Sequence, residues 1–303
     1  MEIKNITIIS EFDKLPLQAV VYEPDGEKKG VLQILHGMCE YKERYAEFMR
    51  YFAEKGFVVF CHDQRGHGDS VLDEADRGYF YDLTSQAIVL DAAQVTRFLK
   101  NEYPDLPITL FGHSMGSMVA RCYLQNHDDL IDKAIICGAP CKNPLAGAAI
   151  ALEKTIRLFC GARHKSKVLA YLSTGRGSEQ FKRAGKGSWL SRNEENVREF
   201  HSNPKGNYKF SCNGFENLFR LMKRSFSKKD YEVKNPTLPV HFVSGSDDAV
   251  LGSEKNFDKV CGFLREVGYK RVTGKLYEGL RHEIFYDIGK EEVLTDLLDF
   301  LCS

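Results

Sequence analysis

Apolar residues in this chain gather in short runs, and stretches with the period of an amphipathic helix separate many of them. Near the N-terminus, Ile6–Ile9 and Leu17–Tyr22 are rich in β-branched residues and flank a turn that contains proline, which predicts a β-ribbon. Further runs are short and apolar enough to be buried strands. In chain order they are Val31–Leu35, Phe57–Phe60, Ile108–Phe111, Ala134–Cys137, Val240–Ser244 and Gly274–Tyr277.

Helical patterns alternate with these predicted strands. They cover Glu43–Lys55, Thr84–Asn101, a stretch that ends at about Asn126, Glu254–Val267 and a final stretch from Lys290. Strands that alternate with helices are joined by crossovers, so they pair in parallel and their helices cover both faces of the sheet. The pattern therefore predicts an α/β fold with a mostly parallel central sheet.

The alternation breaks in the middle of the chain, where the pattern is helical and no convincing buried strand occurs. Residues 141–235 hold 20 Lys plus Arg against 8 Asp plus Glu, so they carry about +12 and the remainder about −12. We expect a core in two parts, 1–139 and 236–303. A helical cap, or lid, at 140–235 is expected to lie over one end of the sheet.

Composition narrows the class of protein. The 303 residues carry 42 basic and 42 acidic side chains, so the chain as a whole lacks the charge of a nucleic-acid-binding protein. The first residues lack the apolar stretch of a secretory signal, and no apolar run approaches the roughly 18 residues of a membrane span. The nine cysteines are scattered and form no C-x-x-C pair. We expect a cytoplasmic protein with free thiols.

The sharpest motif is a G-x-S-x-G pentapeptide at Gly112–Gly116, centred on Ser114. It directly follows the predicted strand Ile108–Phe111 and directly precedes a helical run, which is the context of a nucleophile elbow. Glycines flank the serine because side chains there would collide with the neighbouring strand or helix. The N-terminus of the following helix also favours developing negative charge. Ser114 is therefore the candidate nucleophile, and the alternative is a glycine-rich turn with a bystander serine.

A serine hydroxyl needs an oriented base, and in this kind of site the chain order is Ser, then Asp or Glu, then His. The loop after Val240–Ser244 contains Asp247 and Asp248, and the loop after Gly274–Tyr277 contains His282. We predict that His282 is the general base. We favour Asp248 as its partner because it immediately precedes a turn of small apolar residues, while Asp247 is expected in an Asx-type turn.

The tetrahedral intermediate needs two hydrogen-bond donors for its oxyanion. We expect one to be the backbone N–H of Met115 and the other the N–H of Met38, where Gly37 lets the backbone approach. His36 is expected to brace this loop, and Asp63–Ser70 is expected to be a structural turn. The nine histidines do not fall in metal-binding spacings, so we expect neither a metal nor another cofactor.

With these motifs the chain resembles the monoglyceride lipase and lysophospholipase branch of the α/β hydrolases, which also includes serine aminopeptidase-like members. The resemblance covers most of the chain and implies the α/β-hydrolase fold, the triad Ser114, Asp248 and His282, and the two oxyanion donors. The segments that carry it are His36–Glu40 with Arg44 and Tyr45, Asp63–Ser70, Gly112–Gly116, Gly245–Val250, Tyr277–Glu283, and, in the expected cap, Ser188–Asn193 with Asn203 and Pro204.

The resemblance further implies cleavage of carboxylic esters through an acyl-enzyme, by a lysophospholipase, a monoacylglycerol lipase or a related carboxylesterase. We expect contacts with the substrate from Gly37, Cys39, His113, Trp189 and Val250. Thioesterase or aminopeptidase-like chemistry stays open, because these reactions use the same triad. Non-catalytic ligand binding on the same fold is a further alternative, although binding alone does not need an intact triad.

The charge of the expected cap suggests a partner. A lid of about +12 attracts anionic substrates or an anionic membrane surface, and the alternative is a solvated basic face that offsets an acidic core. Apolar side chains of the cap are expected either to line an acyl pocket or to form the cap's own small core. They are Leu158, Phe159, Leu169, Tyr171, Leu172, Trp189, Phe215, Leu218, Phe219 and Leu221.

Overall fold

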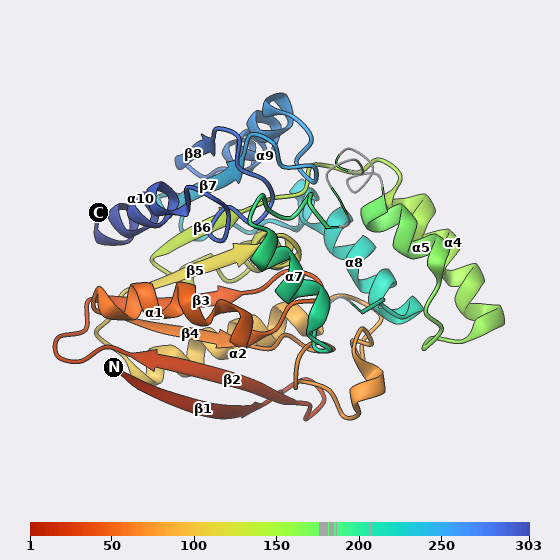
Figure 1. The fold of residues 1–303 in the computed structure, drawn as a ribbon, viewed down its shortest axis with the longest axis horizontal. Coiled ribbons are helices and arrows are strands. Elements are labelled where there is room, and N and C mark those ends of the chain that lie inside the picture. The colour runs from red at the N-terminus through yellow and green to blue at the C-terminus, as the bar shows by residue number, and fades with distance from the viewer. Residues whose placement is uncertain (176–180, 182–184, 186, 207) are drawn as a thin grey trace.

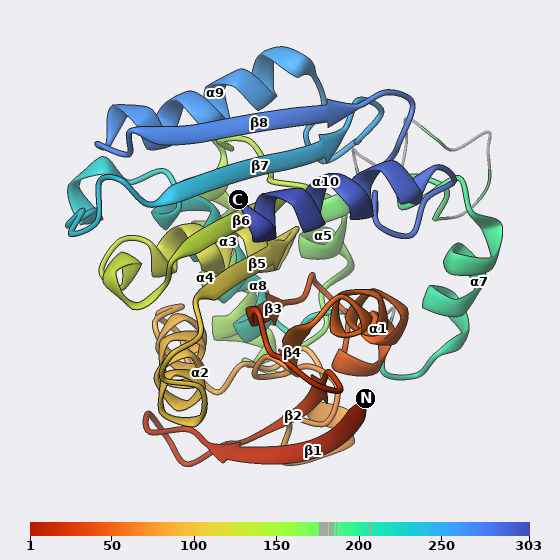
Figure 2. The same cartoon turned by 90° about the vertical axis from the view of Figure 1, so that its left-hand side faces the viewer.

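The computed structural model describes residues 1–175, 181, 185, 187–206 and 208–303. Within them the centre of the molecule is an eight-stranded sheet with the spatial order β1-β2-β4-β3-β5-β6-β7-β8 (Figures 1 and 2). Each strand that the sequence predicts is present. The strands are β1 (Glu2–Ile9), β2 (Pro16–Glu23), β3 (Gly30–Leu35), β4 (Phe57–His62), β5 (Ile108–His113), β6 (Lys133–Cys137), β7 (Pro239–Gly245) and β8 (Arg271–Tyr277).

The sheet is antiparallel at one edge and parallel through the rest. β1 pairs with β2 and β2 with β4 in antiparallel register, whereas the strands from β4 to β8 in the sheet order pair in parallel. All positions of β3, β4 and β5 are buried, as their apolar sequences require in a sheet covered on both faces. The loops after the parallel strands therefore meet at one carboxyl edge, where ligands bind in open α/β sheets.

Helices cover both faces of the sheet (Figure 2). α1 (Ala46–Glu54) and α10 (Lys290–Cys302) pack on one face, where their apolar side chains form a core cluster with residues of the strands. α2 (Ala87–Glu102), α3 (Met115–Tyr123) and α9 (Glu254–Glu266) belong to a second cluster on the other face. The α/β architecture predicted from the hydrophobic pattern is confirmed.

Two helices begin later than their sequence patterns predict. The predicted helix at Glu43–Lys55 starts as a 3-10 turn at Lys42–Tyr45 and continues as α1. α2 begins at Ala87, two residues after Ser85, whose φ of 59° does not fit a right-handed helix. The carboxylate of Asp82 accepts hydrogen bonds from the backbone N–H groups of Gln86 and Ala87 at 3.0 and 3.2 Å and so satisfies donors at this end of the helix.

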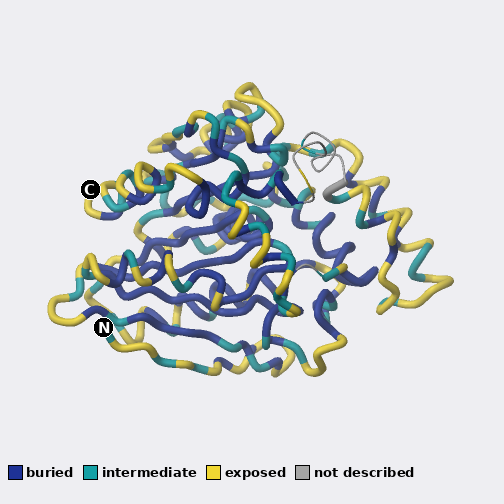
Figure 3. Tube along the Cα trace, viewed as in Figure 1, coloured by how far each residue is buried: buried dark blue, intermediate teal, exposed yellow. Residues whose placement is uncertain are grey.

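Between β6 and β7 the described residues form helices and turns at the carboxyl edge of the sheet (Figure 1). The helices are α4 (Ala146–Cys160), α5 (Lys167–Ala170), α7 (Glu194–Ser202) and α8 (Cys212–Arg224). α4 presents much of its length to solvent (Figure 3). Among the helices of the described ranges, none combines the length and the apolarity that a membrane span requires. Some residues of the expected cap lie outside the described residues, namely 176–180, 182–184, 186 and 207.

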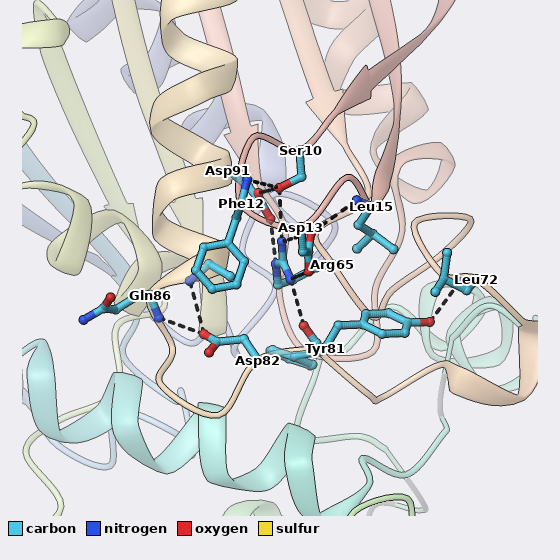
Figure 4. Close-up of polar contacts among 12 residues, drawn as sticks. Ser10, Phe12, Asp13, Leu15, Arg65, Leu72, Tyr81, Asp82, Gln86 and Asp91 are labelled. Carbon is cyan, nitrogen blue, oxygen red and sulfur yellow. Dashed lines mark hydrogen bonds and ion pairs between the residues drawn. The ribbon is translucent and has the colours of Figure 1, made fainter.

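The turn at Asp63–Ser70 joins three segments through Arg65 (Figure 4). The fully buried guanidinium donates to Asp91 of α2 at 2.7 Å and to Asp13, in the turn between β1 and β2, at 2.9 Å. It also donates to the carbonyl oxygen of Phe80 at 3.0 Å. A buried charge persists where it is paired and hydrogen-bonded, so these contacts fix the N-terminal ribbon against α2.

Candidate active site

Ser114 lies in a sharp turn between β5 and α3. Its backbone has φ 52° and ψ −113°, a conformation that residues with a side chain adopt only under strain. A Cβ at Gly116 would overlap the carbonyl oxygens of Leu35 and His36, because α3 passes very close to the end of β3. This contact is the physical reason for the glycine in the motif. The turn leaves Ser114 half-buried at the carboxyl edge of the sheet.

The three candidate triad side chains come together at this edge. Nε2 of His282 lies 2.8 Å from Oγ of Ser114, and Nδ1 lies 3.0 Å from both carboxylate oxygens of Asp248. The loops after β7 and β8 supply the aspartate and the histidine. These loops approach so closely that a Cβ at Gly245 would overlap the carbonyl oxygen of Leu280. Residues far apart in the sequence thus form one chain of hydrogen bonds.

Asp248 is held in place by its own loop. Its carboxylate accepts hydrogen bonds from the hydroxyl of Ser244 at 2.9 Å and from the backbone N–H of Val250 at 2.8 Å. Asp247, the other acid in the loop, is exposed, and its carboxylate lies 3.5 Å from the hydroxyl of Ser246. The structure therefore places Asp248, and not Asp247, against the imidazole.

Burial and charge act in opposite directions on this pair. Burial disfavours the imidazolium, but the carboxylate of Asp248 outweighs it and raises the pKa of His282 above its ordinary value. Burial also disfavours the carboxylate, yet His282 and the hydrogen bond from Val250 lower the pKa of Asp248. The aspartate is therefore ionised, and its charge lies where it would stabilise an imidazolium formed at His282.

Two backbone N–H groups near Ser114 are available as donors. Met115 is the first residue of α3, where backbone N–H groups have no partner within the helix, and Met38 lies in the loop after β3. Within the described residues neither of these N–H groups donates to another protein atom. The close approach of Gly116 to Leu35 brings the two segments together, as an oxyanion hole would require.

A buried carboxylate anchors the loop that carries Met38, and the motif reasoning assigned it no role. Oε2 of Glu40 accepts hydrogen bonds from the backbone N–H of Gly37 at 2.6 Å and from the hydroxyl of Tyr45 at 2.7 Å. It also lies 3.5 Å from Nδ1 of His113. Burial opposes ionisation, but these neighbours, chiefly His113, hold the pKa of Glu40 well below its ordinary value. The sequence feature that could have indicated this role is the position of Glu40, three residues after Gly37 in the segment His36–Glu40.

A second buried carboxylate connects the histidine loop to the segment between β6 and β7. Glu283, directly after His282, accepts hydrogen bonds from the guanidinium of Arg44 at 2.7 Å and from the amide of Asn196 in α7 at 2.6 Å. The backbone N–H of Glu283 donates to the carbonyl oxygen of Leu190 at 2.8 Å. The position of the candidate base therefore depends on contacts with this segment.

The predicted substrate contacts occupy different surroundings. Trp189 is half-buried, and the centre of its ring lies 5.4 Å from that of His282, so the indole covers one side of the imidazole. Cys39 and His113 are buried, with 4% and 1% of their surface exposed. The ring of His113 lies 4.8 Å from that of His282, and the thiol of Cys39 donates to the carbonyl oxygen of Tyr208. The remaining two, Gly37 and Val250, are the donors to buried carboxylates described above.

His36 braces the loop after β3, as expected from the sequence. Its Nδ1 lies 2.8 Å from the carbonyl oxygen of Gly37, and its Nε2 accepts a hydrogen bond from the backbone N–H of Gln64 at 2.9 Å. Burial lowers the pKa of His36, so the ring stays neutral and can serve as donor at one nitrogen and acceptor at the other. The ring therefore links the loops after β3 and β4.

The described residues include one group of carboxylates close enough to share a metal ion, formed by Glu43, Asp63 and Asp69. The ammonium of Lys42 contacts all three at 2.8 to 2.9 Å. Lys205, from the segment between β6 and β7, pairs with Asp69 at 2.6 Å. These two ammonium groups pair with all three carboxylates, so the group forms a set of ion pairs between that segment and the core.

Comparison with known families agrees with this geometry. The family model that describes serine aminopeptidases of the S33 type matches residues 26–289, which is most of the chain. The chain belongs to this S33 family. Its fold is therefore the α/β-hydrolase fold, in which a strand-turn-helix elbow presents the nucleophile at the carboxyl edge of the sheet.

Relatives of this S33 member include lipases. The chain is 26% identical over 283 residues to a monoacylglycerol lipase of Mycolicibacterium smegmatis, a match that covers 93% of this chain and 91% of the relative. It is 27% identical over 270 residues to the human monoglyceride lipase, covering 88% and 80%. A thermostable carboxyl esterase from Bacillus coagulans, solved in complex with glycerol, superposes with a TM-score of 0.88 at 27% identity, covering 99% and 98%.

Proposed function

We propose that this S33-family protein hydrolyses carboxylic esters through an acyl-enzyme, with monoacylglycerols or lysophospholipids as substrates. The observation that carries the proposal is the chain of hydrogen bonds from Oγ of Ser114 through His282 to Asp248. Relatives named monoacylglycerol lipase and an esterase structure support ester chemistry at this triad.

The geometry supports a two-stage reaction. Ser114 attacks the ester carbonyl while Nε2 of His282 accepts its proton, and the ionised Asp248 stabilises the resulting imidazolium. The backbone N–H groups of Met38 and Met115 then stabilise the negative oxygen of the tetrahedral intermediate. His282 returns the proton to the leaving alcohol. A water molecule, activated by the same histidine, releases the fatty acid in the second stage.

We further propose that residues 140–235 act as a cap that takes its substrate from an anionic lipid surface. Leu158 and Phe159, which were candidates for an acyl pocket, are each 80% exposed and so lie on the outside of α4. Together with the excess of basic residues, they support contact with lipid. The large exposed apolar residues of α4, α5 and the adjoining segments are Leu145, Leu152, Leu158, Phe159, Val168, Tyr171 and Leu172.

Labelling with a fluorophosphonate tests the nucleophile, because this reagent bonds covalently to an activated serine. We expect labelling of the wild type and none of Ser114→Ala, with Ser225→Ala, a buried serine directly after α8, as the control. Equal labelling of wild type and Ser114→Ala contradicts the proposed nucleophile.

A substrate panel tests the reaction class. We expect turnover of p-nitrophenyl esters of medium acyl chains, monoacylglycerols and lysophospholipids, and loss of this turnover in Ser114→Ala. Exclusive turnover of peptides or of short acetyl esters contradicts the proposed substrates. The double variant Leu158→Ser/Phe159→Ser tests the lipid contact, because it should lower turnover of lipid in vesicles and leave turnover of a soluble ester unchanged.

A further inference from the structure

A concavity lies in the segment between β6 and β7, and none of its lining residues is a member of the candidate triad or oxyanion hole. Its volume is about 380 Å³, within the range of small-ligand pockets. α4 and α8 form its walls, and the chain that leaves α8 closes one side. The residues that line it are Gly147, Ile150, Lys154, Arg220, Lys223, Arg224, Ser227, Lys229 and Asp230.

The lining of this pocket is strongly basic. Five cationic side chains and one carboxylate, that of Asp230, line it, so the lining residues sum to a net charge of +4, and one of the five, Arg220, is paired with the adjacent Glu216. The ammonium groups of Lys154, Lys223 and Lys229 are exposed, and within the described part of the chain no carboxylate forms an ion pair with them. Like charges held around one concavity repel each other, and an anion bound there relieves that repulsion.

The two arginines are half-buried and already oriented. Arg224 donates through Nη1 to the carbonyl oxygen of Ser85 at 2.8 Å, and Arg220 donates through Nε and Nη2 to Glu216 at 3.0 and 2.7 Å. Each guanidinium keeps further N–H groups for a ligand. Oriented guanidinium groups bind phosphate by paired hydrogen bonds, and nearby lysines add charge.

The pocket is separate from the triad. The carbonyl oxygen of Arg224 accepts a hydrogen bond from Gln125, just beyond the C-terminal end of α3, whereas Ser114 precedes the N-terminal end of the same helix. The nine residues of α3 span about 13 Å, since an α-helix rises about 1.5 Å per residue. A ligand held by Arg224 is therefore not in position to react with Ser114.

We propose that this pocket binds a phosphate group, carried either by a small soluble molecule or by the head group of a phospholipid. A phosphate monoester offers up to two negative charges to the cationic lining and several acceptor oxygens to its free N–H donors. A single carboxylate would neutralise less of this charge. The site is distinct from ester hydrolysis, so its test does not depend on the proposed function.

Titration calorimetry with inorganic phosphate tests the site on the full chain. We expect saturable binding by the wild type and an affinity lowered by about tenfold or more in Lys154→Ala/Lys223→Ala. The matched control is Lys167→Ala/Lys209→Ala, which removes two exposed lysines of the same segment outside the pocket and should bind as the wild type does. Lys229→Ala is a milder variant that should weaken binding if the double variant fails to fold.

Vesicles distinguish the two sources of the phosphate. Cosedimentation with phosphatidylcholine vesicles that contain phosphatidic acid, whose head group is a phosphate monoester, should be lost in the pocket variant more than in the control if the head group is the ligand. If soluble phosphate alone binds, the vesicle results of the two variants should agree while the calorimetry differs. The proposal is overturned if the pocket and control variants match the wild type in both measurements, or if both variants lose binding equally.

Discussion

The carboxylate of Glu40 accepts a hydrogen bond of 2.6 Å from the backbone N–H of Gly37, the residue directly before Met38. This bond fixes the peptide plane that leads into the proposed oxyanion donor. Glu40 is also bonded to Tyr45 and lies beside His113, the residue directly before Ser114. It therefore links the loop after β3 to the nucleophile elbow. The orientation of the proposed oxyanion hole therefore depends on a charge that is almost fully buried.

The variant Glu40→Gln should lower kcat by about ten- to a hundredfold with little change in KM. Loss of one oxyanion donor costs about a hundred- to a thousandfold in kcat, and a displaced donor should cost less. Steady-state kinetics on a p-nitrophenyl ester measures the effect. Glu47→Gln, an exposed change on α1, serves as the control, and an unchanged kcat in Glu40→Gln rules out the positioning role.

The acid limb of the pH profile should report His282. The base must be neutral, and Asp248 raises the pKa of His282 above its ordinary value of about 6.5, so kcat/KM should fall as pH drops through that raised pKa. In Asp248→Asn the imidazolium loses its partner, so the limb should move to lower pH while kcat falls by about 10⁴-fold.

Trp189 gives an independent readout of the same titration. It is the single tryptophan of the chain, and its ring lies 5.4 Å from that of His282. We expect its fluorescence to change across the pH range in which kcat/KM falls, and the midpoint to move lower in Asp248→Asn. If the fluorescence midpoint is the same in Asp248→Asn as in the wild type, the assignment of the acid limb to His282 is contradicted.

Glu153→Gln should stabilise the protein at pH 8 more than at pH 5. Burial and the charge of Glu216 outweigh the nearby Arg157 and raise the pKa of Glu153 to about 7. Since its unfolded value is about 4.5, the folded state binds the extra proton between these values, and the free energy of unfolding falls as pH rises through this window. This loss of stability at high pH is absent in the glutamine variant.

Thermal unfolding at the two pH values checks this prediction. The gap in Tm between Glu153→Gln and the wild type should widen from pH 5 to pH 8. Glu195→Gln, an exposed change at the start of α7, should show no such widening. A constant gap for Glu153→Gln means that this carboxylate does not titrate in the window.

Asp91→Asn should destabilise the fold by about 3 to 5 kcal/mol, because it leaves the guanidinium of Arg65 buried without its closest charge partner. Asp13→Asn removes the more exposed partner of the same guanidinium and should cost clearly less. Denaturant unfolding followed by circular dichroism measures both variants. Equal, small effects would show that the buried pair contributes little to stability.

Much of the fold follows from local patterns. Short apolar runs such as Val31–Leu35 became buried strands because a sheet covered on both faces excludes polar side chains at nearly every position. Helix starts were less predictable. α2 begins only at Ala87 because the backbone of Ser85 has a left-handed φ of 59°, and the amphipathic pattern does not contain that information.

The candidate site was partly predictable for the same reason. Ser114 can be recognised from its flanking glycines. These glycines are required by contacts within a few residues of the turn and with the end of β3. The small apolar turn that follows Asp248 favoured it over Asp247, and the structure places Asp248, buried, against His282. Glu283 could not be recognised, since its partners Arg44 and Asn196 lie far away in the chain.

The fold class and the candidate reacting residues follow from the order of apolar runs, the glycine spacing around the elbow and the order of serine, acid and histidine along the chain, because these features act over short stretches or through simple periodicity. Only the tertiary structure decided which carboxylates are buried, which of them orient the reacting groups, and how the basic residues of α4 and α8 gather around one pocket. The strength of an electrostatic contact depends on distance and on exclusion of water, and both arise when distant segments pack together.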